Sequence, residues 1–108
     1  MAFIIAITPS YKVKVIVEMP NEAGRIEKSD FMAQFKRVSM DDLDELRKRP
    51  QKEVLEEVLI GWTGLLDENK ESVPFNQATL ASVLAIPQAF SALADSFWGS
   101  IFKAKEKN

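Results

Sequence analysis

Hydrophobic and polar residues alternate in the first third of the chain. Between Lys12 and Glu18 a valine occupies every second position, which is the period of a half-buried strand. A turn at residues 20–24 follows, and a second alternating run extends from Lys28 to Val38. Its apolar face consists of Phe31, Ala33 and Phe35. The pattern predicts a β-hairpin that exposes one apolar face for helices to cover.

The apolar run from Phe3 to Ile7 precedes this hairpin. It is shorter than a membrane span or a signal-peptide core, and no basic residues come before it. We therefore expect it to add a third strand to the sheet and expect the protein to reside in the cytoplasm.

Helical spacing replaces the alternation after residue 38. Ser39 followed by an acidic first turn predicts a helix start, and Pro50 separates this helix from a second one. The second helix carries an i, i+1, i+4, i+5 apolar stripe made of Val54, Leu55, Val58 and Leu59. Gly61 is expected to end it.

Two further helices are predicted after residue 75. Asn76 can cap the first of them, which ends at Ile86-Pro87, and the last helix covers roughly Gln88 to Lys103. Its apolar stripe is wide and contains Phe90, Leu93, Ala94, Phe97, Trp98, Ile101 and Phe102. Strands followed by helices indicate an α+β fold, a small antiparallel sheet packed against C-terminal helices.

A length of 108 residues suits a single domain with one core. We expect strands within residues 1–38, helices within residues 39–103 and a frayed charged tail at residues 104–108.

Composition excludes several kinds of chemistry. The chain has no cysteine and no histidine, which removes disulfides, cysteine zinc sites and the usual general base. A net charge of −2 argues against a dedicated nucleic-acid binder, and a helix-turn-helix within residues 76–102 would have no lysine or arginine for phosphates. We expect no catalysis, no cofactor and no metal.

The segment from Gly61 to Phe75 has the most specific sequence. Its acidic turn does not fit a calcium loop, because Ser72 stands where glycine is required and Ala78 where a glutamate ligand is required. A tryptophan between glycines is more often a core residue than a partner anchor. We therefore expect a structural elbow formed by Gly61, Trp62, Gly64, Pro74 and Phe75.

The helical region beyond the elbow is nearly uncharged. From Ser72 to Phe102 the single charged residue is Asp95, and two helices cannot bury all of their sides against one sheet. We expect a surface for a protein partner or for self-association, formed by Phe90, Phe97, Trp98, Ile101 and Phe102.

The elbow sequence, together with the flanking residues 58–60, Asn76, Leu80, Leu84, Ile86 and Pro87, resembles a family of tail assembly chaperones of long-tailed bacteriophages and prophages. The residues from Phe31 to Leu43 are similar as well. Relatives commonly have glycine in the acidic turn, where this chain has Asn69-Lys70. Asparagine tolerates a left-handed conformation, so we expect the turn to be preserved.

The resemblance implies a protein of the bacterial host cytoplasm that binds the aggregation-prone tape measure protein and assists tail tube assembly. The tail tube protein is a second candidate partner, and a homo-oligomer is expected. The alternative is a structural phage tail subunit, either of the tube or an adaptor.

Overall fold

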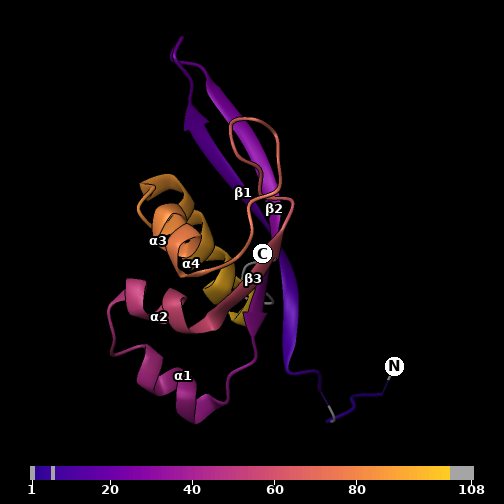
Figure 1. Ribbon diagram of the computed structural model, residues 1–108. Helices are drawn as coiled ribbons and strands as arrows, with labels where there is room; N and C mark the ends of the chain where they lie inside the picture. Colours follow the sequence, from indigo (N-terminus) through magenta and orange to yellow (C-terminus); the bar gives the residue numbers. More distant parts are fainter. Residues whose placement is uncertain (1, 6, 103–108) are drawn as a thin grey trace.

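A long antiparallel hairpin forms most of the sheet in the computed structural model, which describes residues 2–5 and 7–102 (Figure 1). β1 (Ser10–Pro20) pairs with β2 (Ile26–Lys36) along its whole length. The turn between them is closed by the side chain of Asn21, which accepts hydrogen bonds from the backbone N–H groups of Ala23 and Arg25. The inner face is the predicted one, because Val15, Val17, Phe31, Ala33 and Phe35 are all buried.

The third strand is β3 (Leu59–Thr63), which pairs with β2 and gives the strand order β1-β2-β3. The prediction of a strand at Phe3 to Ile7 was wrong, since the described residues of that run lie in no strand. The reason is that β2 ends at Lys36, opposite Ser10, so within the described chain no strand lies opposite the residues before β1. The expected helix end at Gly61 was also wrong, because β3 begins directly after the second helix.

A β-bulge decides which residues of β3 reach the core. Gly61 lies opposite Gln34, whereas Leu59 lies opposite Phe35, so Ile60 is the extra residue. Residues three apart in a regular strand point to opposite faces. The extra residue allows both Leu59 and Trp62 to enter the core and leaves Ile60 exposed.

The helices of the described chain are α1 (Met40–Leu46), α2 (Gln51–Val58), α3 (Gln77–Leu84) and α4 (Pro87–Phe102). They lie on one side of the sheet, and α2 and α4 contact its strands (Figure 1). The predicted caps are confirmed: Ser39 accepts from the backbone N–H of Asp42, and Asn76 forms a reciprocal capping box with Thr79. Lys103 and the expected tail at 104–108 lie outside the described residues.

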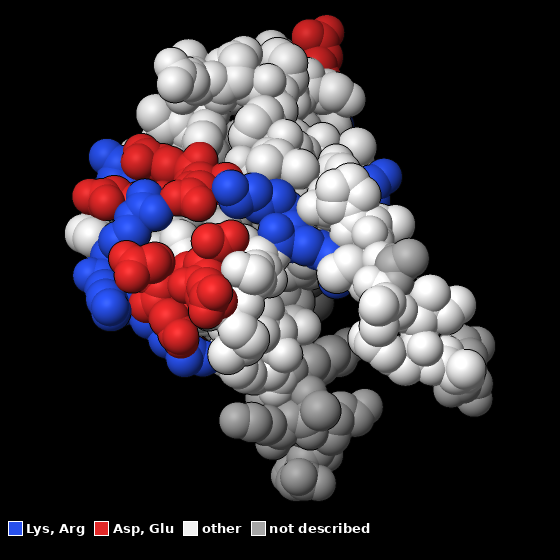
Figure 2. Space-filling view, turned by 90° about the horizontal axis from the view of Figure 1, so that it is seen from below, with Lys and Arg blue, Asp and Glu red and all other residues white. Residues whose placement is uncertain are grey.

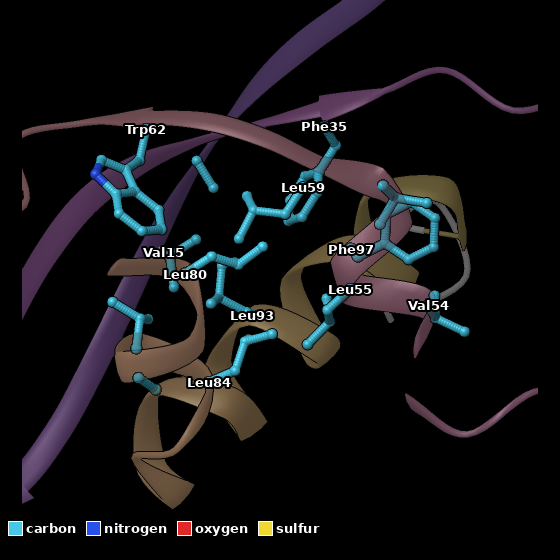
Figure 3. Packing of buried hydrophobic residues seen from close by; sticks show 14 of the residues in the cluster. Val15, Phe35, Val54, Leu55, Leu59, Trp62, Leu80, Leu84, Leu93 and Phe97 are labelled. Atoms are coloured by element: carbon cyan, nitrogen blue, oxygen red, sulfur yellow. The ribbon is translucent and has the colours of Figure 1, made fainter. Parts of the chain in front are cut away.

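All seven elements contribute to one hydrophobic core (Figure 3). Its centre is Phe35 on β2 and Phe97 on α4, whose rings are tilted with centroids 5.3 Å apart. Within the described part of the chain no polar or charged side chain is buried. The expected α+β fold is therefore confirmed, with a three-stranded antiparallel sheet packed against helices.

Candidate protein interaction surface

Trp62 of the elbow belongs to the core. Its side chain is 9% exposed, and the indole N–H donates a 2.8 Å hydrogen bond to the backbone carbonyl of Val73. The rings of Trp62 and Phe75 pack edge to face, with their centroids 4.7 Å apart. The elbow therefore joins β3 to the segment before α3 through its aromatic side chains, as a structural role requires.

The acidic turn of the elbow closes on itself. The carboxylate of Asp67 accepts hydrogen bonds from the backbone N–H groups of Asn69 and Glu71, and a β-bridge joins Leu66 to Ser72. The left-handed residue is Lys70, with φ of 63°, and not Asn69 as the sequence suggested. Among residues 2–5 and 7–102 no group of three or more acidic side chains is placed to hold a metal ion.

Lys70→Gly is expected to raise the free energy of unfolding by about 0.5 kcal/mol. Glycine removes the steric cost of the left-handed conformation, although part of this gain is offset by the greater entropy of the unfolded chain. Urea unfolding followed by circular dichroism measures the change. Asn69→Gly is the matched control and should destabilise, because Asn69 does not have a positive φ. Equal effects of the two substitutions would contradict this assignment.

The five residues predicted to bind a partner occupy two different environments. Phe97 is fully buried against Phe35 and Trp98, so it is removed from the candidate surface. It lies at the centre of the apolar stripe, where the sheet covers it. The other four are half-buried: Phe90, Trp98, Ile101 and Phe102. Of these, Phe90, Trp98 and Ile101 pack against the edge of the core.

Trp98 and Phe102 are held by the charged helices beside α4. The indole N–H of Trp98 donates a 2.9 Å hydrogen bond to Oε1 of Gln51, at the start of α2. The guanidinium of Arg47 lies over the ring of Phe102, 5.3 Å from its centroid. A partner that docks along α4 would therefore meet these rings next to Gln51 and Arg47.

The charged and uncharged parts of the surface are separate. Acidic and basic side chains gather over α1 and α2, next to a wide area without charge (Figure 2). The exposed residues of α3 and α4 are mostly small or neutral. They include Ala78, Ala81, Ser82, Gln88 and Ser91, with Asp95 as the one charge. We define α3 and α4 with their exposed and half-buried side chains as the uncharged helical surface.

An ion-pair network fixes the charged helices to the sheet. Arg49 pairs with both Glu53 and Glu57, and Lys36 of β2 lies 3.3 Å from the carboxylate of Glu57. The hydrogen bonds from Arg49, and then from Lys36, lower the pKa of Glu57 below its ordinary value of 4.5.

This shift predicts a pH-dependent contribution to stability. A carboxylate whose pKa is lower in the folded state stabilises above its unfolded pKa, and the contribution disappears as the pH falls through the folded pKa. Glu57→Gln should lower the free energy of unfolding at pH 7 by less than about 1 kcal/mol, because the side chain is 36% exposed. The difference from the wild type should shrink at pH 3, measured by urea unfolding. Glu56→Gln is the exposed neighbouring control, and an equal loss at both pH values would contradict the prediction.

A groove that the sequence did not predict lies between β1 and the C-terminal half of α4. It has a volume of about 850 Å³, and its apolar lining includes Ile7, Tyr11, Val13, Val38 and Ile101. The hydroxyl groups of Tyr11 and Ser100 are hydrogen-bonded at 2.8 Å and join its two walls. Lys12, Lys14 and Arg37 place positive charge at its edge.

No single helix in the described residues is long and apolar enough to cross a membrane, and α3 with α4 meets that test only as a pair bent by 100°. No family model, no curated protein and no solved structure matches the chain.

Proposed function

We propose that this protein is a phage tail assembly chaperone, which binds the tape measure protein and assists tail tube assembly without catalysis. The observation that carries the proposal is the uncharged helical surface, where Phe90 and Ile101 are half-buried and Asp95 is the one charge. Apolar segments of a client can dock there without removing charged groups from water, which would be costly. Exposed serines such as Ser82 and Ser91 supply hydrogen bonds along the same helices.

The proposal places the protein in the cytoplasm of the bacterial host, with the tape measure protein as its main partner and the tail tube protein as a second one. A homo-oligomer is part of the proposal. No chemical step is included, because the chain has neither histidine nor cysteine.

Co-expression with the tape measure protein of the same phage tests the proposal. The wild-type chain should move the tape measure protein into the soluble fraction and should co-purify with it. Ser91→Glu adds a charge seven residues before Trp98 and thus on the same side of α4, so it should reduce both effects. Lys52→Glu changes a charge on the already charged helix α2 and should leave both unchanged. A purified wild-type chain that neither binds nor solubilises the tape measure protein would exclude the function.

A structural tail subunit, of the tube or an adaptor, is the second candidate. The observation in its favour is the edge strand β1 beside exposed apolar residues, an arrangement suited to permanent subunit contacts. A structural subunit remains in purified virions in stoichiometric amounts, whereas an assembly chaperone does not. Mass spectrometry of the particles therefore separates the two.

A further inference from the structure

The most exposed large apolar side chains lie before the sheet, outside the uncharged helical surface. Phe3 and Ile5 are each 84% exposed, Ile4 is 70% exposed and Ile7 is 61% exposed. The described parts of this segment lie before the start of β1 and away from the helices (Figure 1). We call the described residues 2–5 and 7 the arm.

Among the described residues no strand pairs with the arm. The backbone N–H of Arg37 donates to the carbonyl of Pro9, one residue beyond the last pair of the hairpin. The chain then turns into α1, and Pro9 itself has no N–H to offer. Another chain can supply the backbone and side-chain partners for an extended apolar segment in this position.

A suitable acceptor exists on the same molecule, and therefore on every copy of it. β1 is an edge of the sheet, so among the described residues no strand pairs with its outer side. The groove of about 850 Å³ lies between this strand and α4. An extended peptide can pair with such an edge through its backbone while alternate side chains enter the pocket beside it.

We infer that two copies of this chain form a dimer by exchanging arms, each arm lying along β1 in the groove of the other copy. Phe3, Ile5 and Ile7 recur at every second position, so an extended arm directs all three to one side. That side meets the apolar groove residues Tyr11, Val13, Val38 and Ile101.

The exchange is reciprocal and closes after two copies, which is the usual form of a homodimer. Ile7 lines the groove of its own chain, so each arm begins beside the groove that the arm of the other copy occupies. The inference specifies the homo-oligomer of the proposed function but requires no client, so a monomeric chain would overturn arm exchange without excluding client binding.

Cysteine pairing tests the exchange directly, since the chain has no cysteine of its own. Chains with Ile5→Cys are mixed with chains with Ser96→Cys, a groove residue, and oxidised gently. A disulfide between positions 5 and 96, identified by peptide mapping, is intermolecular by construction and is the expected result. Ile26→Cys, at a similarly exposed isoleucine in the hairpin, should not cross-link to Ser96→Cys. Absence of the 5–96 disulfide would overturn the inference. Efficient formation of an intramolecular 5–96 disulfide in a diluted chain that carries both Ile5→Cys and Ser96→Cys would overturn it as well.

Sedimentation velocity gives an independent measurement. The wild-type chain should be a dimer at about 100 µM, and Ile5→Lys should raise its dissociation constant by about 100-fold or more, because a positive charge would replace an apolar contact in a groove whose edge carries Lys12, Lys14 and Arg37. Ile26→Lys is the matched control and should sediment like the wild type. A wild-type monomer at this concentration, or a dimer insensitive to Ile5→Lys, would exclude arm exchange. The second outcome would indicate another contact, such as direct pairing of two β1 edges.

Discussion

Trp62→Ala is expected to lower the free energy of unfolding by about 3–5 kcal/mol, which is a large part of the stability of a domain of this size. The substitution empties a site between β3 and the segment before α3, removes the edge contact with Phe75 and leaves the carbonyl of Val73 without its indole donor. Because Trp62 closes the elbow, α3 should lose its fixed position relative to the sheet. Urea unfolding followed by far-UV circular dichroism measures the loss.

Two other substitutions separate the contributions of Trp62. Trp62→Phe retains most of the apolar volume but not the hydrogen bond, so its effect should be smaller than that of alanine. Trp98→Ala is the matched control, because Trp98 also donates through its indole N–H but is only half-buried. If Trp98→Ala destabilised as much as Trp62→Ala, the structural role assigned to the elbow would be wrong.

Phe97→Ala is expected to cost a similar amount, about 3–5 kcal/mol. Phe97 is fully buried where α4 faces the sheet, and its loss leaves a cavity beside Phe35 and separates α4 from β2. Thermal unfolding should show a markedly lower midpoint, and near-UV circular dichroism should show weaker aromatic packing.

Phe90→Ala is the control for Phe97. Phe90 lies on the same helix and is only half-buried, so its truncation should cost clearly less stability. In the co-expression assay Phe90→Ala should weaken client binding while the chain remains folded. A Phe97→Ala chain as stable as the wild type would show that α4 does not pack as described.

Local sequence rules located most elements of the fold because each rule concerns only a few residues. The alternation around Val15 and Phe35 determines which face of the hairpin is buried, and Ser39 and Asn76 satisfy helix N–H groups within one turn. These features do not depend on distant parts of the chain, so they could be predicted without the structure.

The third strand could not be predicted in this way. Leu59 continues the helical stripe of Val54, Leu55 and Val58, yet it is buried from a strand because a bulge shifts the register beside Phe35. The run from Phe3 to Ile7 has the composition of a strand, but strand formation requires a neighbour, and β2 ends too early to supply one. Pairing partners depend on the whole topology and not on local composition.

The low charge of the candidate surface could be predicted from the sequence, but the residues that form the surface could not. The uncharged stretch from Ser72 to Phe102 is visible in the sequence, and its exposed residues on α3 and α4 are uncharged apart from Asp95. Figure 2 shows an area without charge next to the charged side chains. The burial of Phe97 depends on the angle at which α4 crosses the sheet, which periodicity alone does not determine. The groove beside β1 depends on the same angle.

The hydrogen bond between Tyr11 and Ser100 joins positions 89 residues apart, from the first strand to the last helix. α4 packs on β1, so the core cannot close until nearly all of the described chain has left the ribosome. Contacts this distant in sequence carry a high loop-closure cost and slow the folding of a small domain. During synthesis the apolar face of the hairpin therefore stays uncovered, and this protein passes through the same aggregation-prone condition from which a chaperone protects its client.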